Sequence, residues 1–221
     1  YNNKIYIISC NGDLGIFDTT TNTISLGEPI PYYMEMTTIS ATLYNDKIYV
    51  IGARPPSPML YTFYIYDIAS NTWTEGSNMQ NAKVGSSITV HDGKIYAAGG
   101  FEFGYDDPSY IIDDIQAYDI QKDVWETVGS VQNGENIITA AYNENYYVLC
   151  PVNFTNVKNG IEITSVDWFG NAPEAVVQDE NLIYSFEDKD LTIVDLLNDL
   201  TYDGAPIPNS VGYRSEEHTS E

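Results

Sequence analysis

The chain has 221 residues, 43% of them hydrophobic, which is enough to bury the core of one domain or of a large part of one. Lys and Arg number 9 and Asp and Glu number 32, so the formal net charge is −23, and such a surface repels nucleic-acid phosphates and anionic lipid heads. No apolar run approaches the roughly 18 residues of a membrane span. We therefore expect no nucleic-acid partner and no membrane span, and nothing in the chain indicates a compartment.

Cysteine and histidine are scarce, with two of each. Cys10 and Cys150 leave no disulfide framework, and we expect both as buried free thiols. Two histidines argue against most zinc and copper chemistry. No metal and no other cofactor is expected.

A short segment recurs in five copies along the chain. Residues 1–7 (YNNKIYI) align with 44–50 (YNDKIYV) and, with one residue inserted, with 90–97 (VHDGKIYA); weaker copies cover 142–148 and 179–184. The second aromatic residue of each copy recurs at steps of 43, 47, 51 and 37 residues. These marker residues are Tyr6, Tyr49, Tyr96, Tyr147 and Tyr184. A period of this length indicates a repeat architecture.

A second marker follows the first three copies: an aromatic residue, then Asp, then a large apolar residue six positions after the Asp. The three instances are Phe17-Asp18 with Ile24, Tyr66-Asp67 with Trp73, and Tyr118-Asp119 with Trp125. We expect each Asp to accept backbone N–H bonds in the turn before the last strand of its unit. We expect each tryptophan to fill the space between sheets.

Each unit is expected to form four short strands. In the second unit these are residues 38–43, 47–51, 61–67 and 72–74, with turns at Asn45-Asp46 and Ser70-Asn71. No segment has the pattern of an amphipathic helix. One such sheet leaves apolar faces bare, and stacking the sheets around an axis covers them, so the sequence predicts an all-β fold, a β-propeller.

The markers resemble those of the kelch repeat, in which a hydrophobic strand ends in Gly-Gly and is followed by Tyr-Asp and then by Trp. The third unit has all of them, with Gly99-Gly100 before Tyr118-Asp119 and Trp125. The second keeps half of the diglycine in Gly52-Ala53, and the remaining units match less well. The resemblance implies a kelch-type β-propeller over residues 1–213.

The expected repeats cover approximately 1–37, 38–85, 86–135, 136–173 and 174–213, which makes about five four-stranded blades. The first unit begins at its turn and the fifth stops where another first strand would start, so we expect an incomplete ring, a fragment of a larger propeller. Residues 214–221 contain no apolar residue and resemble translated adapter sequence from a sequencing library. We expect this tail to be non-native and leave it out of the fold.

The candidate binding residues lie in the loops between the second and third strands, because loops vary most between units and carry function in propellers. The expected loop of the second unit, 53–60, holds Arg54, three prolines and Met59. In kelch proteins that bind peptides this loop often supplies a contact arginine, so the resemblance implies that role for Arg54. The prolines stiffen the loop and lower the ordering cost of binding.

The expected loop of the third unit, 101–110, combines aromatic and acidic residues. They are Phe101, Phe103, Tyr105, Asp106 and Asp107. Two interpretations stay open for the rings: they contact a partner, or they pack back on the blade. The aspartates do not follow the spacing of an EF-hand loop, and we expect a solvated acidic loop.

The favoured function is a scaffold without catalytic activity that binds another protein or a peptide through these loops, and no catalytic residue is identified. The alternative is a glycan-processing or sugar-epimerase-type propeller enzyme, since Tyr, Glu and Asp suffice for proton transfer on sugars. A copper oxidase resembling galactose oxidase is disfavoured, because it needs two histidines on copper and the chain offers one, His91, outside the tail. A third possibility is a structural array with no defined ligand.

Overall fold

The computed structural model describes most of the chain up to residue 203. The described residues are 1–31, 38–54, 60–80, 85–102, 110–131, 137–143, 145–149, 156–159, 161–163, 175–179, 182–187, 190–196 and 200–203. All regular structure in these ranges is β-strand. None of them contains a helix long and apolar enough to cross a membrane.

The described strands form five sheets in chain order, each an antiparallel meander. The first contains β1 (Lys4–Ile8), β2 (Leu14–Asp18) and β3 (Thr23–Leu26). The second contains β4 (Thr38–Tyr44), β5 (Lys47–Arg54), β6 (Leu60–Asp67) and β7 (Thr72–Glu75). The third contains β8 (Ser87–His91), β9 (Lys94–Ala98), β12 (Asp114–Asp119) and β13 (Val124–Ser130). A separate ladder of β10 (Phe101–Glu102) and β11 (Tyr110–Ile111) lies between β9 and β12 in the chain.

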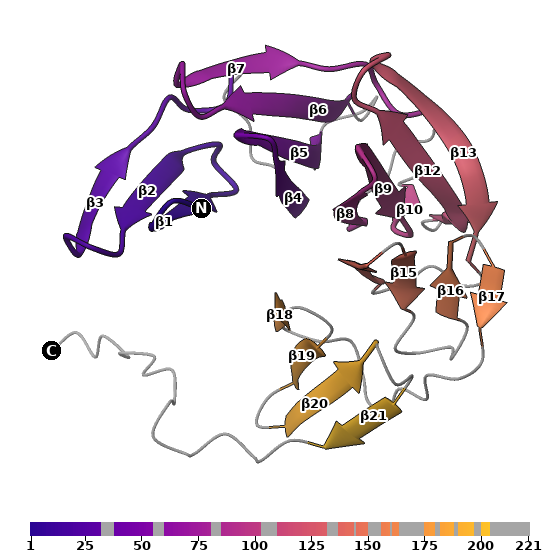
Figure 1. Ribbon diagram of the computed structural model, residues 1–221. Helices are drawn as coiled ribbons and strands as arrows, with labels where there is room; N and C mark the ends of the chain where they lie inside the picture. Colours follow the sequence, from indigo (N-terminus) through magenta and orange to yellow (C-terminus); the bar gives the residue numbers. More distant parts are fainter. Residues whose placement is uncertain are drawn as a thin grey trace, which may run out of the picture.

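The last two sheets have four strands each. The fourth contains β14 (Ile138–Tyr142), β15 (Asn145–Leu149), β16 (Asn156–Lys158) and β17 (Ile161–Ile163). The fifth contains β18 (Ala175–Asp179), β19 (Leu182–Glu187), β20 (Asp190–Asp195) and β21 (Leu200–Asp203). Figure 1 shows the five sheets following one another in an arc, with first strands such as β4, β8 and β18 toward the centre and last strands such as β7, β13 and β21 outside. This radial order is that of propeller blades, as the repeats predict.

Tight hairpins join the first two strands of the second and third sheets, as expected from their turn residues. Asn45 and Asp46 have φ of 48° and 60°, between the paired residues Tyr44 and Lys47. Asparagine and aspartate tolerate this left-handed conformation, which two-residue hairpins require. The predicted Asn45-Asp46 turn is confirmed.

The Asp of each second marker closes the turn before the last strand, which confirms its predicted role. The Asp67 carboxylate accepts hydrogen bonds from the backbone N–H and the hydroxyl of Ser70, at 3.0 and 3.1 Å. Asp18 and Asp119 accept equivalent bonds. These partners favour the ionised carboxylate. The hydrogen bond from the Ser70 N–H is the largest cause of the lowered pKa of Asp67, and the hydrogen bond from the Lys122 ammonium is the largest cause of the lowered pKa of Asp119. All three turns therefore keep a charged aspartate at neutral pH.

The sheets pack on one another through a repeating rule. The first four marker tyrosines face the following sheet, so that Tyr49 clusters with Ile95 and Tyr147 with Ile183. The residue just before the marker, such as Ile48, faces the preceding sheet. The alternation of side chains along a strand thus sends successive residues into two different inter-sheet cores.

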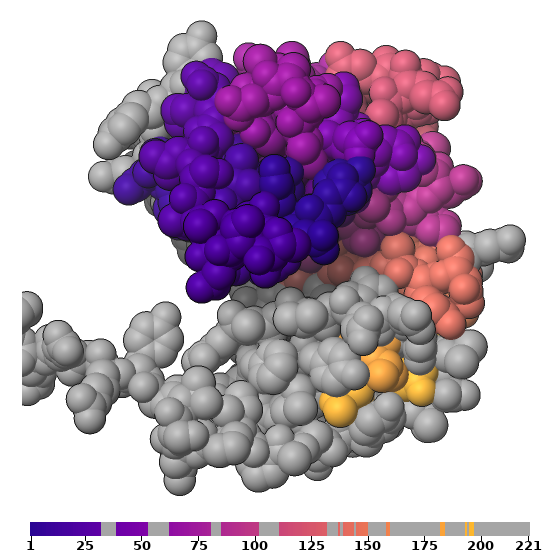
Figure 2. Space-filling model, turned by 60° about the vertical axis from the view of Figure 1, so that its left-hand side comes forward, coloured from indigo at the N-terminus to yellow at the C-terminus, as the bar shows by residue number. Residues whose placement is uncertain are grey.

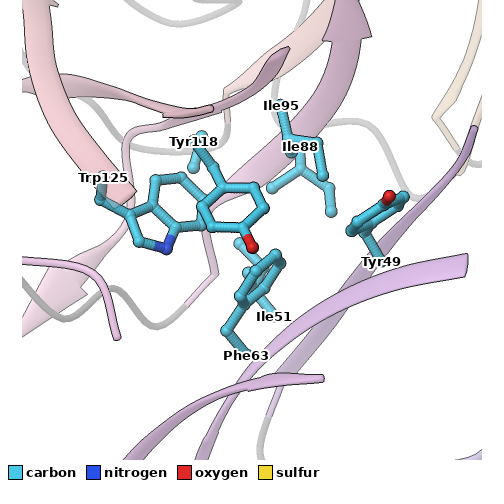
Figure 3. Packing of buried hydrophobic residues seen from close by; sticks show 8 residues of the cluster. Tyr49, Ile51, Phe63, Ile88, Ile95, Tyr118 and Trp125 are labelled. Carbon is cyan, nitrogen blue, oxygen red and sulfur yellow. The ribbon is translucent and has the colours of Figure 1, made fainter. Parts of the chain in front are cut away.

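The core between the second and third sheets is centred on Phe63 of β6. Figure 3 shows its ring among Tyr118, Trp125 and Tyr49. The ring of Phe63 meets Tyr118 and Trp125 edge-on, with centroids 4.6 and 5.2 Å away. Aromatic rings in this geometry stabilise each other beyond the burial of their area. Trp73 and Trp125 are 9% and 6% exposed, so their predicted core role is confirmed.

Each of these tryptophans also ties its sheet to the connection that precedes the sheet. The Trp73 indole donates to the Glu28 carbonyl at 2.7 Å, and the Trp125 indole donates to the Ser77 carbonyl at 2.8 Å. The side chain of Asp123 accepts from the Ser77 N–H at 3.0 Å, as Asn71 does from Glu28. Glu28 and Ser77 thereby have hydrogen-bond partners for both the backbone N–H and the backbone C=O.

Replacing Gly76 with alanine should destabilise the protein by about 1–3 kcal/mol, because it overpacks this core. An added Cβ would lie 2.5 Å from Cδ1 of Phe63, a ring that is 1% exposed and held between two aromatic neighbours. Gly15→Ala is the matched control, since its nearest atom would be 3.6 Å away. Urea unfolding of both variants tests this; equal stability of the two would contradict the packing described.

Candidate interaction site

The second strands end, and the third strands begin, on one face of the arc, because neighbouring sheets are aligned. The Ser40 hydroxyl accepts from the Ile88 N–H at 3.2 Å, and the Ser87 hydroxyl accepts from the Thr139 N–H at 3.0 Å. Ser40 and Ser87 occupy equivalent positions on β4 and β8, opposite Ile51 and Ala98. This repeated hydrogen bond keeps the first strands in one register, so equivalent strand ends lie on the same face of the arc.

The arginine loop of the second unit is shorter than predicted. Ala53 and Arg54 belong to β5 and pair with Tyr61 and Leu60 of β6, although we expected 53–60 as a loop. The strands continue because tertiary pairing satisfies their backbone groups up to the first proline. Met59 and the rest of 55–59 lie outside the described residues, as does the Arg54 side chain.

The diglycine of the third unit redirects the chain after β9. Gly99 and Gly100 have φ of 66° and 94°, a region that residues with a Cβ rarely adopt. The chain then enters β10, where Phe101 pairs with Ile111, and the Ile112 N–H bonds the Gly100 carbonyl at 2.9 Å. The expectation of an open loop over 101–110 is therefore wrong at both ends, since residues 101, 102 and 110 belong to a strand ladder.

Phe101 is the one predicted aromatic contact among the described residues, and it is half-buried. A Cβ built on Gly85 would lie 3.5 Å from its ring, so the ring lies against the start of the third sheet. This supports the packing interpretation for Phe101. The other four candidates of this loop lie outside the described residues: Phe103, Tyr105, Asp106 and Asp107.

Sequence reasoning missed Ile111, which is 41% exposed and lies directly across the ladder from Phe101. Cross-strand partners share one face of a sheet, so the two side chains form an apolar spot at the base of the third loop. Asp113, two residues further on, is exposed. The run Tyr110-Ile111-Ile112 was the available signal, but an apolar run inside an expected loop does not say which residue faces solvent.

A hollow of about 600 Å³ beside the loop of the first unit was also missed. Its walls come from that loop, from the connection to the second sheet and from the start of β7. The lining residues are Asn11, Asp13, Glu28, Pro29, Ile30, Pro31, Asn71, Thr72 and Trp73. The Ile30 N–H bonds the Gly12 carbonyl at 2.9 Å, which fixes the connection against the loop. The concave site thus combines the carboxylates of Asp13 and Glu28 with apolar surface from prolines and Trp73.

Other candidate chemistry is not assembled in the described part of the chain. No group of three or more His, Cys, Asp or Glu side chains there is placed to hold a metal ion. Asp114 accepts from the Gln116 amide at 2.8 Å and belongs to a largely buried network. Cys10 is exposed, so the expected burial is wrong for that thiol; Cys150 lies outside the described residues.

Comparisons with known proteins agree with the repeat and the arc. The family model described as the Kelch motif matches residues 82–132. Kelch-like protein 23 of Homo sapiens is 30% identical over 130 residues, which is 58% of this chain and 22% of that protein. Alpha-scruin of Limulus polyphemus is 28% identical over 112 residues, 50% of this chain and 12% of the relative. The chain thus spans about a fifth or less of the length of these two curated relatives.

Among solved structures, one described as YjhT superposes with a TM-score of 0.62 at 14% sequence identity, covering 83% of this chain and 68% of that one. A likeness at this identity concerns the fold alone. The fold is an all-β propeller of stacked antiparallel sheets, as predicted. Residues 82–132 match the Kelch motif and the chain is similar to kelch-repeat proteins, so the predicted resemblance is confirmed.

Proposed function

We propose that the chain is a protein-interaction scaffold that binds another protein or a peptide at its loop end. The kelch-repeat relatives support an interaction scaffold in general terms. Two observations carry the proposal: Ile111 is exposed at the base of the third loop, and a concave site lies beside Asp13 and Glu28. Interfaces combine apolar anchors with a polar rim in this way.

The partner we propose is a basic segment. The chain carries a net charge of −23, which attracts cationic partners over a distance and repels acidic ones. At the hollow, the carboxylates of Asp13 and Glu28 suit a lysine or arginine head, while the Pro29 and Trp73 surface suits its aliphatic stem. Complementary charge would speed association and make it sensitive to salt.

The loop candidates identified from the sequence complete the proposed surface. Arg54 is the last residue of β5, and we propose that it binds backbone carbonyl groups of the partner. We include the remaining loop candidates in the surface: Met59, Phe103, Tyr105, Asp106 and Asp107. Aromatic and arginine side chains on such loops are the usual anchors of an interface.

The glycan-processing alternative is not favoured. A general acid for sugar chemistry needs a carboxyl group that still holds its proton near neutral pH. The described carboxyl groups with a shifted pKa all have a lowered one, because hydrogen bonds stabilise their ionised form. They are Asp18, Asp67, Asp119 and Asp123. They serve the fold, and no described observation points to a sugar.

A peptide-binding measurement tests the proposal. Residues 1–221 should bind a pool of Lys- and Arg-rich peptides more tightly than matched acidic or neutral pools, by fluorescence anisotropy, and binding should weaken as salt rises. Ile111→Asp should weaken binding at least about tenfold, which is about 1.4 kcal/mol, and Arg54→Ala should weaken it as well.

Val124→Asp is the matched control, because Val124 is 47% exposed on the outer strand β13, away from the loops. It should leave the affinity unchanged. Equal affinity for all three peptide pools, or equal effects of Ile111→Asp and Val124→Asp, would refute the proposed surface.

A further inference from the structure

The hollow of the first unit has a counterpart one repeat further along the chain. Figure 2 shows the first unit, in indigo, directly against the second, in violet, and residues of both units line the hollow. The connection 27–31 (GEPIP) after the first sheet corresponds to 76–80 (GSNMQ) after the second. In both, the first glycine donates its N–H to a carbonyl of β2 or β6 at 2.9 Å. Pro31 therefore corresponds to Gln80.

Gln80 ties the second connection to the third sheet. Its backbone N–H donates to the side chain of the fully buried Gln116 at 3.1 Å, and its side-chain amide donates to the Trp125 carbonyl at 3.4 Å. The Thr127 hydroxyl donates to the amide oxygen of Gln80, also at 3.4 Å. In the second repeat this place is thus occupied by one planar group that both donates and accepts hydrogen bonds.

The first repeat has no side chain that could fill the same place. Pro31 stands at the position of Gln80 and carries neither an N–H nor a side-chain amide. Glu75 stands at the position of Thr127, as the pairing of the third and last strands shows, and its carboxylate accepts where the hydroxyl donates. Pro31 and Trp73 both line the hollow, so the hollow corresponds to the place that Gln80 fills in the next repeat.

The backbone carbonyl of Trp73 is an acceptor at the outer edge of β7. The Gly76 N–H bonds the Phe63 carbonyl, so these two residues form a hydrogen-bonded pair of the β6–β7 ladder. Such pairs alternate with non-hydrogen-bonded ones along antiparallel strands, and Trp73, three positions along, belongs to the second kind. Its carbonyl therefore points away from β6. The Trp125 carbonyl has the same orientation and accepts the amide that occupies the next repeat.

The charged groups around the hollow are all acceptors. Its lining includes the carboxylates of Asp13 and Glu28, and no Lys or Arg is among its lining residues. Two prolines and Trp73 add flat apolar surface. An amide like that of Gln80 would bring its own acceptor oxygen among these carboxylates, whereas a guanidinium presents only donors, all in one plane.

From these observations we infer that the hollow binds the guanidinium of an arginine in the partner, in preference to the ammonium of a lysine. The inference rests on the proposed function, which places a basic segment here, and it names the residue that the hollow selects. The guanidinium takes the place of the Gln80 amide, donates to the Trp73 carbonyl and to the carboxylates, and lies on the proline surface. A lysine ammonium is compact and strongly hydrated, so it satisfies fewer of these acceptors at once.

Peptides that differ only in the basic residue test the inference on residues 1–221. In fluorescence anisotropy, an arginine peptide should bind at least about tenfold more tightly than the same peptide with lysine in place of arginine. A citrulline peptide keeps the planar shape without the charge and should bind no better than the lysine peptide. Equal affinity for arginine and lysine overturns the inference and leaves the proposed basic partner standing. If neither peptide binds, the proposed function fails with it.

Two variants place the preference at the hollow. Pro31→Gln puts an amide at the exposed position equivalent to Gln80 and should abolish the preference for arginine over lysine. Glu28→Gln keeps the backbone bonds of that residue and should weaken arginine binding about tenfold. Asp92→Asn, in the exposed β8–β9 turn, removes the same charge elsewhere and should leave the preference unchanged. A folded Pro31→Gln protein, checked by circular dichroism, that keeps the full preference overturns the inference.

Discussion

Replacing Trp125 with alanine should lower the free energy of unfolding by about 3–5 kcal/mol, the largest loss that a single substitution in this chain should cause. The indole fills the space between the second and third sheets, where it meets the rings of Phe63 and Tyr118. Its N–H also donates to the Ser77 carbonyl at 2.8 Å. The substitution would therefore open a cavity and orphan a carbonyl at once.

Two further variants separate these contributions. Trp125→Phe keeps much of the ring and removes the donor, so it should lose about 1–3 kcal/mol. Val124→Ala, at a neighbouring exposed site, should change stability by less than about 0.5 kcal/mol. Urea unfolding followed by far-ultraviolet circular dichroism measures all three. A Trp125→Ala protein as stable as Val124→Ala would contradict the inter-sheet packing.

The protein should also lose stability steeply in alkali, between pH 10 and about 12. Burial raises the pKa of Tyr146 from 10.0 to about 12, and burial together with the hydrogen bond to Asp123 raises the pKa of Tyr118. The same direction holds at four other tyrosines, chiefly through burial: Tyr6, Tyr49, Tyr66 and Tyr96. These six tyrosines therefore share this behaviour.

The sign follows from proton binding. A raised pKa in the folded state means that the unfolded chain releases its tyrosine protons first, so the stabilisation is complete below pH 10 and is lost as pH rises toward the folded values. Each such group loses up to about 1.4 kcal/mol per pH unit in that window. Urea unfolding from pH 8 to 12, read beside tyrosinate absorbance, measures it.

Substitution of a single tyrosine makes the test specific. Tyr118→Phe should reduce the dependence of stability on pH in this window, because it removes one titrating group from the core. Val124→Ala, which removes no titrating group, should leave the dependence unchanged. A stability that stays level while the tyrosines ionise would contradict the assignment.

Much of the strand pattern could be predicted locally. In the second unit the turn at Asn45-Asp46 and the starts of β5 and β7 fall where the sequence indicates, because Asn, Asp and Gly supply the left-handed conformations that hairpins need. The end of β5 and the start of β6 do not, since pairing across the sheet carries β5 three residues past the predicted end and begins β6 one residue before the predicted start. Strand ends depend on partners that lie elsewhere in the chain.

The candidate site was predicted less well. Arg54 was assigned to a loop and Ile111 was passed over, because whether a loop residue pairs, packs or faces solvent depends on the neighbouring sheet. Phe101 illustrates this: its ring lies against Gly85, a residue from a different connection. The hollow beside Asp13 and Glu28 has no local signature at all, since its walls come from segments up to 60 residues apart.

The sequence alone predicts the period of the marker tyrosines, the Asp turns and the core tryptophans, because the residues that define each of them lie within a single repeat. It does not predict which faces of a sheet are covered by a neighbouring sheet. Ile5 and Ile95 have the same local sequence, yet one is 53% exposed and the other fully buried, because among the described residues a preceding sheet packs against Ile95 and none packs against Ile5. Burial is a property of the neighbour as much as of the residue, and the neighbour of each repeat is set by stacking in three dimensions.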